Sequence, residues 1–272
     1  MTPTTALTIA GSDSGGGAGI QADLRTFSAH GVHGTSAITA VTAQNTTGVR
    51  HIETMSTTSL LSQIEAVLDD FSVAAVKTGM LATPALVEVV AEFARLGLLP
   101  HLVVDPVLVS STNHLLLADG GVEVYRDLLL PHAAIVTPNL REAAVLCDVA
   151  LDSIDSVEAM TAIGRQIAGF GPRAVLVKGG HFGGEQPTTA PDVLIEGDQV
   201  LVFDGPRVST RNDHGTGCSL SAALCALLAT GSTIAEACSI AKSFVAEALA
   251  GAATWQLGRG PGPIDHLGWG RD

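Results

Sequence analysis

The sequence predicts an α/β fold in which a mostly parallel central sheet carries helices on both faces. Strand-like and helical segments alternate through most of the 272 residues, which is typical of parallel sheets. Glycine is plentiful, with 30 residues, whereas aromatic residues make up only 4%, a composition that suits closely packed helices and strands. Because the sequence contains no internal repeat, linker or low-complexity segment, we expect one domain over residues 1–272.

Buried strands are expected where a short apolar run is bounded by glycine or polar residues. In chain order these runs are Leu7–Ala10, Ser36–Ala43, Ala74–Lys77, Leu102–Val104, Ala133–Val136 and Ala174–Lys178. Two later runs, Val193–Glu196 and Val200–Phe203, are joined by Gly197-Asp198, which indicates a hairpin.

Helices are expected between and after these strands, where apolar residues recur three or four positions apart. In chain order they are Ala18–His30, Thr57–Asp70, Pro84–Leu96, Val122–Leu130, Leu140–Cys147, Ser156–Phe170, Gly217–Thr230 and Thr233–Ala252. Ligands of parallel sheets bind beyond the carboxyl ends of the strands. The loops that follow the strands are therefore where chemistry is expected.

Charge and composition exclude several classes of function. The formal net charge is −13, and the chain has only 14 basic residues, so general nucleic-acid binding is not expected. No apolar run has the length of a membrane span, and the N-terminus does not resemble a signal peptide. The four cysteines lack the spacing of a zinc site. We therefore expect a cytoplasmic protein that acts without a membrane.

The sharpest motif is Asp213-His214-Gly215-Thr216-Gly217-Cys218, directly before a predicted helix. Backbone N–H groups at Gly215, Thr216 and Gly217, together with the helix dipole, would form an anion hole for a phosphoryl group. Cys218 would lie in the first helical turn, where the dipole favours a thiolate that could accept a proton. A structural, buried Cys218 remains the alternative. Cys225 and Cys238 are expected to pack on apolar helix faces, and Cys147, at a helix end, is expected to be inert.

A second glycine-rich loop, Gly11–Gly19, follows the first strand. It is a weak match to a dinucleotide-binding loop, because no acidic residue ends the second strand, and it lacks the P-loop Gly-Lys-Ser/Thr. A loop that closes over a small polar ligand fits better. Asp23, one turn into the next helix, is either a ligand contact or an ordinary helix-terminal acid.

Several other strands end in chemically useful residues. Lys178 ends one strand, Asp105 follows another, and Asn139 with Glu142 follows a third. A lysine there suits a phosphate oxygen and a carboxylate suits hydrated Mg²⁺. The spacing of Asn139 and Glu142 also matches a capping box, which by itself accounts for both residues. Taken together, these strand ends supply the cation, metal ligands, anion hole and base that phosphoryl transfer requires.

The chain resembles the hydroxymethylpyrimidine/phosphomethylpyrimidine kinases of thiamine biosynthesis, within the ribokinase-like superfamily. The resemblance extends essentially from end to end. The segments that carry it are Ile9–Asp23, Thr39–Thr46, Lys77–Met80, Asp105–Val107, Thr137–Asn139 with Glu142, Val177–His181, His214–Cys218 and Gly260–Pro263.

This resemblance implies a ribokinase-like three-layer sandwich that uses ATP and Mg²⁺ to phosphorylate 4-amino-5-hydroxymethyl-2-methylpyrimidine and then its monophosphate. Cys218 would be the base, Lys178 would contact ATP phosphate, and Asp105 with Glu142 would serve Mg²⁺ or its waters. The residues implied to bind the pyrimidine are Gly11, Ala18, Asp23, Gln44, Met80 and Val107. The superfamily resemblance also suggests a homodimer.

One stretch departs from the family pattern. Where the family commonly has a lysine within an Ala-Lys-Ser-Gly-Asp-like run, this chain has Val109-Ser-Ser-Thr-Asn-His114. The loss of a lysine and a carboxylate bears on the second phosphorylation, for which His114 would be a weak substitute cation. Two alternatives stay open: a pyridoxal kinase, and a pyrimidine-binding protein without catalysis.

Overall fold

The computed structural model describes residues 2–108, 120–180 and 188–270. Within these residues, nine strands form one sheet in the order β3-β2-β1-β4-β5-β6-β7-β8-β9. The strands are β1 (Thr5–Asp13), β2 (His33–Asn45), β3 (Gly48–Thr54), β4 (Val73–Thr78), β5 (Val103–Val104), β6 (Ile135–Val136), β7 (Ala174–Lys178), β8 (Asp192–Glu196) and β9 (Gln199–Phe203). The strands β2, β1, β4, β5, β6 and β7 are parallel neighbours. The pairs β2–β3, β7–β8 and β8–β9, at the two edges, are antiparallel.

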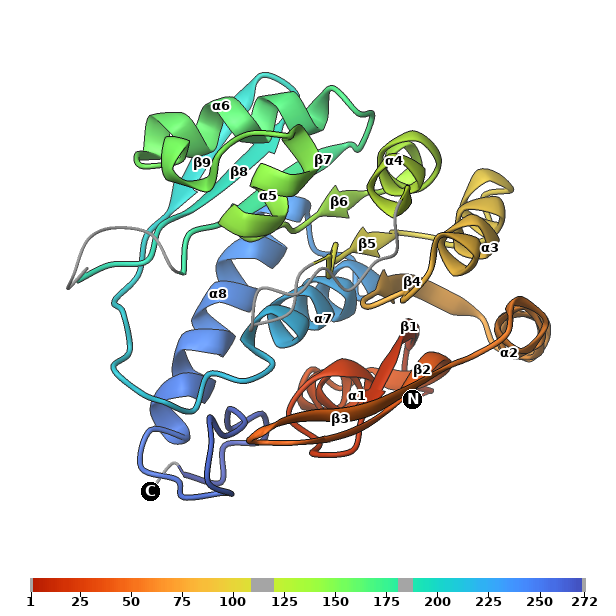
Figure 1. Cartoon of the computed structure of the whole chain (residues 1–272), viewed down its shortest axis with the longest axis horizontal. Coiled ribbons are helices and arrows are strands. Elements are labelled where there is room, and N and C mark those ends of the chain that lie inside the picture. Colours follow the sequence, from red (N-terminus) through yellow and green to blue (C-terminus); the bar gives the residue numbers. More distant parts are fainter. Residues whose placement is uncertain (1, 109–119, 181–187, 271–272) are drawn as a thin grey trace.

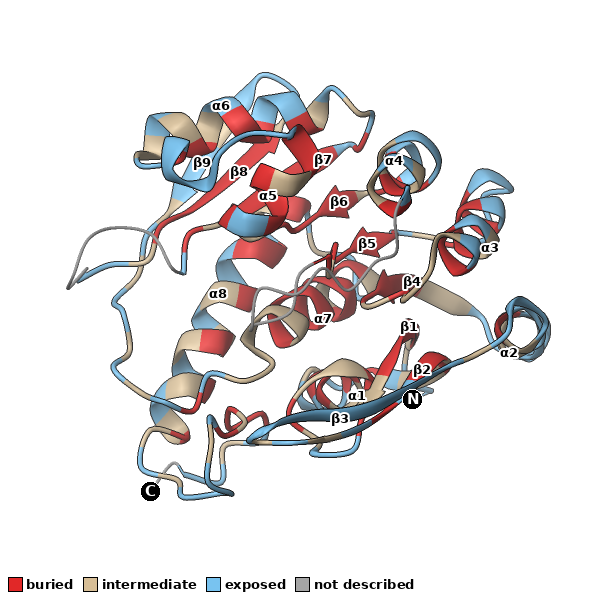
Figure 2. Cartoon of the chain, viewed as in Figure 1, coloured by how far each residue is buried: buried red, intermediate tan, exposed pale blue. Residues whose placement is uncertain are grey.

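Helices cover both faces of this sheet, as the alternating pattern predicts (Figure 1). The helices are α1 (Gly19–Ala29), α2 (Thr57–Asp70), α3 (Pro84–Arg95), α4 (Gly121–Val124), α5 (Leu140–Cys147), α6 (Val157–Ala168), α7 (Thr216–Ala229) and α8 (Ile234–Gly251). One buried cluster joins the sheet to α2, α3, α5 and α6, and the other joins it to α1, α7 and α8. Burial is concentrated on the sheet-facing sides of these helices (Figure 2).

Two regions differ from the sequence expectation. The strand β3 was not expected, because all seven of its residues are exposed and include Arg50, His51 and Glu53, so it has no buried apolar face to mark it. The expected helix Val122–Leu130 is a short α-helix, α4, followed by a π-helical turn at Tyr125–Leu129 and a 3₁₀ turn at Leu130–His132. Pro131 lacks the N–H that would continue a regular helix.

The strand order reverses between β1 and β4. From β1 the chain moves outward to β2 and β3, and then returns to place β4 on the other side of β1. Ligands of open parallel sheets bind at such a reversal, beyond the carboxyl ends of the strands. The fold therefore directs the ends of β1 and β4, and the loops that follow them, toward one site.

Candidate active site

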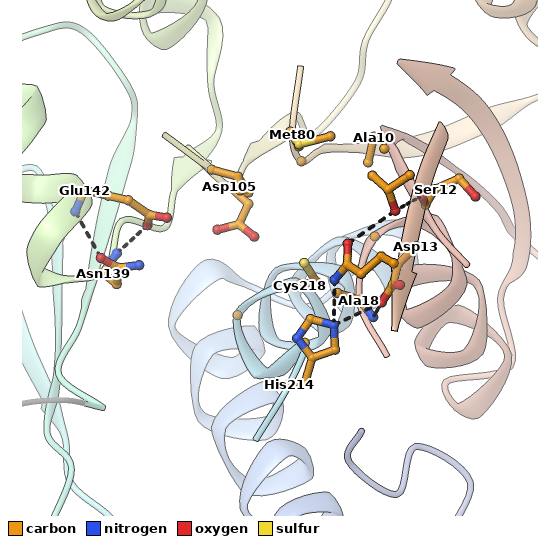
Figure 3. Close-up of a pocket in the computed structure, with 18 of the residues that line it drawn as sticks. Ala10, Ser12, Asp13, Ala18, Met80, Asp105, Asn139, Glu142, His214 and Cys218 are labelled. Atoms are coloured by element: carbon orange, nitrogen blue, oxygen red, sulfur yellow. Dashed lines mark hydrogen bonds and ion pairs between the residues drawn. The ribbon is translucent and has the colours of Figure 1, made fainter. Parts of the chain in front are cut away.

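A cavity of about 390 Å³ lies at this reversal point, a size suited to a small ligand. It is lined by residues in or just after β1, β2, β4, β5, β6 and β7, by Val49 and Ile52 of β3, and by the start of α7. The expected site residues in its wall are Gly11, Ala18, Gln44, Met80, Asp105, Val107, Glu142, Lys178, Gly215, Gly217 and Cys218. Many of them point toward a common space (Figure 3).

The two glycine-rich motifs are packed directly against each other. Gly215 has a φ of +84°, and a Cβ atom there would lie 1.8 Å from the carbonyl oxygen of Gly17. A Cβ atom on Gly17 would in turn lie 2.4 Å from the ring of His214. Only glycine allows both close approaches. The Gly215–Gly217 turn therefore places the N-terminus of α7 at the cavity. The backbone N–H groups and the helix dipole favour an anion there.

Cys218 lies in the first turn of α7 and lines the cavity. The prediction that the helix dipole favours a thiolate at Cys218 is wrong, because burial outweighs the dipole. Burial raises the pKa of Cys218 to about 11, while the positive charge of Lys77 opposes this rise. Cys218 is thus a strong base once deprotonated, and in the free protein it is mainly a thiol.

Asp23 is not where the family resemblance implies. Its side chain is fully buried behind the cavity, where both carboxylate oxygens lie 2.9 Å from Nζ of Lys77. Thr8 Oγ1 donates a third hydrogen bond to Asp23 Oδ2 at 2.6 Å. The described cavity wall contains Lys77 but not Asp23. Asp23 therefore acts as the counter-ion of a buried lysine, and in this structure it is not placed to touch the ligand.

The sequence predicts Lys77 only as the last residue of a strand. In the structure it is a buried cation in the cavity wall. Burial lowers the pKa of Lys77, but the charges of Asp23, Cys218 and Asp105 outweigh burial and raise it well above its usual value. Lys77 therefore remains protonated. It gives the floor of the cavity a fixed positive charge.

Lys178 supplies a second cation at the end of β7. Its Nζ donates to Asp105 Oδ1 at 2.9 Å, and Asp105 also accepts from Ser221 Oγ at 3.2 Å and Thr137 Oγ1 at 3.3 Å. Burial raises the pKa of Asp105, but Lys178 and Lys77 outweigh it and hold the pKa below its usual value. Asp105 is therefore an ionised group that positions Lys178.

Glu142 serves the helix cap and the cavity together. Its Oε2 accepts from the backbone N–H of Asn139 at 2.8 Å, and Asn139 Oδ1 accepts from the N–H groups of Arg141 and Glu142 (Figure 3). This is the expected capping box at the start of α5. Burial raises the pKa of Glu142 to about 8, and the nearby Asp105 adds to the rise. A bound cation at this point would restore its negative charge.

Asp105 and Glu142 fit Mg²⁺ in the manner of kinases rather than as a complete metal cage. Among the described residues, no group of three or more His, Cys, Asp and Glu side chains could hold a metal ion. Mg²⁺ commonly uses one or two carboxylates and completes its shell with water and substrate phosphates. The two carboxylates in the wall, with Glu142 poorly compensated, match that need.

Two side chains without an expected role, Asp13 and His214, link the glycine loops to Gln44. His214 Nε2 lies 3.0 Å from Asp13 Oδ2 (Figure 3) and 3.2 Å from the side-chain amide of Gln44. Asp13 and His214 are 201 positions apart in the chain. The sequence offers one signal for each residue: Asp13 precedes a run of glycines, and His214 lies inside the motif Asp213–Cys218.

A second cavity of about 540 Å³ adjoins the first and shares Asn139, Lys178 and Gly217 with it. Its other walls come from the β8–β9 hairpin side and from α8, including Phe203, Leu249 and Lys242. Thr216 lines this second cavity rather than the first. The anion-hole turn and Lys178 therefore lie between two adjacent cavities.

The remaining cysteines are buried, as expected: Cys147 in α5, Cys225 in α7 and Cys238 in α8. The altered run Val109–His114 and His181 lie outside the described residues. Within the described part of the chain, no helix is long and apolar enough to cross a membrane.

Comparison with known proteins agrees with this geometry. Residues 13–265 match the family model described as phosphomethylpyrimidine kinase. A hydroxymethylpyrimidine/phosphomethylpyrimidine kinase from Rhizobium meliloti is 45% identical over 269 residues, covering 98% of each chain. A crystal structure of phosphomethylpyrimidine kinase from Clostridium difficile is 41% identical, covers 90% of this chain and 99% of that one, and has a TM-score of 0.78.

Pyridoxal kinases share the fold. The Staphylococcus aureus enzyme in complex with AMP-PCP and pyridoxal is 32% identical, covers 100% of this chain and 96% of that one, and has a TM-score of 0.87. The expected ribokinase-like arrangement, with helices on both faces of a mostly parallel sheet, is thereby confirmed.

Proposed function

Because this chain belongs to the phosphomethylpyrimidine kinase family, we propose that it transfers the γ-phosphoryl group of ATP to hydroxymethylpyrimidine and then to its monophosphate in thiamine biosynthesis. The observation that carries this proposal is the position of Lys178 and the Gly215–Gly217 turn between two cavities, with Cys218 in the wall of the first. One cavity takes the pyrimidine and the other takes ATP. The transferred group passes between them.

In the pyrimidine cavity, Met80, Val107, Gly11 and Ala18 enclose the ring. The amide of Gln44 pairs with the aminopyrimidine edge, because it offers one donor and one acceptor. This arrangement directs the hydroxymethyl group at the start of α7. The thiolate of Cys218, the minor form in the free protein, accepts the hydroxyl proton as the oxygen attacks phosphorus. General-base catalysis of this kind contributes about 10²- to 10⁴-fold.

In the ATP cavity, Lys178 neutralises phosphate charge, and the N–H groups of Gly215, Thr216 and Gly217 meet the transferred group. Asp105 and Glu142, in the wall of the first cavity beside Lys178, would hold Mg²⁺ or its waters. When bound, Mg²⁺ supplies charge neutralisation on the phosphates. The S. aureus pyridoxal kinase, whose structure contains AMP-PCP, supports the assignment of a nucleotide to this fold.

A pyridoxal kinase is the second candidate, favoured by the TM-score of 0.87 to the S. aureus enzyme. The sequence identities of 45% and 41% to pyrimidine kinases, against 32% to that enzyme, favour the pyrimidine. A binding protein without catalysis has no need for a base in the wall of the first cavity beside the anion-hole turn. We retain the two-step reaction despite the altered Val109–His114 run, since the full-length R. meliloti relative is named for both substrates.

We further propose a cytoplasmic homodimer that binds neither nucleic acid nor membrane. The dimer would form through the exposed edge of the sheet, where Val41, Val49 and Ile52 are 43%, 51% and 42% exposed. Val49 and Ile52 also line the first cavity, whereas Val41 does not. Apolar side chains exposed on an edge ribbon commonly mark an interface. Multi-angle light scattering of the protein and of Val41→Lys would test this assembly.

The catalytic assignment is tested by Cys218→Ala. We expect loss of ADP release with hydroxymethylpyrimidine, while ATP binding, followed by calorimetry, is retained. Gln44→Ala is expected to raise KM for the pyrimidine and leave KM for ATP unchanged. Normal turnover by Cys218→Ala would remove Cys218 as the base, and an unchanged pyrimidine KM in Gln44→Ala would refute the ring assignment.

A further inference from the structure

Gln44 belongs to a chain of polar contacts that extends beyond the cavity wall. On one side its Nε2 lies 3.2 Å from His214 Nε2, which lies 3.0 Å from Asp13 Oδ2. On the other side its Oε1 lies 3.2 Å from Thr42 Oγ1, which also donates to the carbonyl oxygen of Ser12 at 2.9 Å. Which end of the amide suits each neighbour depends on where the protons of His214 and Thr42 lie.

Asp13 determines the proton on His214. Its Oδ2 accepts from the backbone N–H groups of Gly17 at 3.1 Å and Ala18 at 2.9 Å, and its Oδ1 accepts from Gly15 at 2.8 Å. Burial raises the pKa of Asp13, but these bonds and His214 outweigh it and lower the pKa. An ionised carboxylate only accepts hydrogen bonds. His214 Nε2 must therefore carry a proton and donate it to Asp13.

The protonated Nε2 then determines the orientation of the amide. Two N–H groups facing each other at 3.2 Å would repel, so a protonated His214 Nε2 favours the amide turned by 180°, with its oxygen in place of Nε2 beside the ring. Thr42 suits either end of the amide. Its hydroxyl can donate to the amide oxygen, or it can donate to Ser12 and accept from the amide nitrogen after the turn. His214 therefore decides the orientation.

We propose that Asp13 and His214 are positioning residues that hold the Gln44 amide with its oxygen toward His214 and its nitrogen toward Thr42. The pocket then accepts a ring edge only in one direction, with a donor on the His214 side and an acceptor on the Thr42 side. This inference rests on the proposed function, because it assumes that Gln44 meets the ring.

The orientation fits the order of groups on the substrate. Along the ring edge, the nitrogen acceptor is followed by the amine donor and then by the hydroxymethyl carbon. With the amine on the His214 side, the hydroxymethyl group lies next beyond it, toward Gly215–Cys218, because His214 directly precedes that turn. The reversed amide would reverse the ring and direct the hydroxyl away from Cys218.

A substrate analogue tests the orientation. In 5-hydroxymethyl-2-methylpyrimidin-4-one the amine is replaced by a carbonyl and the ring nitrogen carries a proton, so its donor and acceptor are exchanged. The wild-type enzyme should prefer the amino compound in kcat/KM by roughly 10- to 100-fold, as for other bidentate edge contacts. In His214→Phe, a ring of similar shape without N–H groups, the amide turns freely and the preference should fall toward 1.

The ratio of kcat/KM for the two substrates does not depend on the amount of folded enzyme, because a loss of folded protein would lower both rates equally. His132→Phe is the matched control, because His132 is exposed and lies just before β6, at the opposite end of the strands. It should keep the wild-type preference. A wild-type preference retained by His214→Phe would overturn the proposal.

A second measurement does not depend on turnover. Long-range ¹H–¹⁵N NMR of the imidazole should show a proton on Nε2 of His214 in the free enzyme, and a neutral ring with its proton on Nδ1 would overturn the proposal. If the wild-type enzyme phosphorylated neither pyrimidine, the proposed function would fail and the ring assignment with it. The NMR signal would then still decide how Gln44 is held.

Discussion

Removal of the charge of Lys77 should destabilise the protein more than a typical core substitution. Lys77 and Asp23 are both fully buried, and Nζ lies 2.9 Å from each carboxylate oxygen. In Lys77→Met, Asp23 would keep only the hydroxyl of Thr8 as a partner. Breaking a buried pair in this way costs about 3–5 kcal/mol, because one charge is left uncompensated.

The double variant Lys77→Met/Asp23→Asn removes both charges and should recover most of that loss, because neutral replacements of buried pairs are commonly tolerated. Urea unfolding followed by circular dichroism gives the free energy of unfolding of each variant and their coupling energy. A loss below about 1 kcal/mol in Lys77→Met, or a double variant less stable than the single one, would refute the reasoning. Asp23→Asn should also leave the pyrimidine KM near wild type, since Asp23 does not line the cavity.

Three further predictions concern the site. With a pKa of about 11 for Cys218, the thiolate fraction should rise about tenfold per pH unit from pH 7 to 9. The value of kcat/KM for the pyrimidine at saturating Mg-ATP should rise in the same way. In Cys218→Asp, kcat/KM should not change with pH over this range. Glu142→Gln keeps an acceptor for the α5 cap, so thermal stability should be unchanged. The Mg²⁺ concentration for half-maximal activity should rise roughly tenfold. An unchanged Mg²⁺ requirement would contradict the metal role. Gly215→Ala should destabilise by about 2 kcal/mol or more and abolish activity, because of its φ of +84° and the 1.8 Å approach to Gly17; normal activity would contradict the close packing of the loops.

The layered fold was predictable because burial gives periodic patterns. Helices such as α3 place apolar residues on one face, and buried strands such as β7 are continuous apolar runs. The edge strand β3 could not be predicted, since none of its residues is buried. The π-helical turn after α4 was also not predicted, because its apolar residues have the spacing of an ordinary α-helix.

The site was predictable where each residue belongs to a local motif at a strand end, as Cys218 and Lys178 do. It was not predictable where function depends on pairing between distant segments. Asp23 meets Lys77 across 54 positions, and His214 meets Asp13 across 201. The thiol of Cys218 was also misjudged, because the helix dipole is a local property whereas burial depends on the whole fold.

The central claim is that this kinase acts on both pyrimidines. The most direct measurement is ADP release by the purified protein with Mg-ATP, comparing hydroxymethylpyrimidine, its monophosphate and pyridoxal under the same conditions. We predict turnover of both pyrimidines at a higher kcat/KM than that for pyridoxal. Turnover of pyridoxal alone, or of none of the three, would contradict the account.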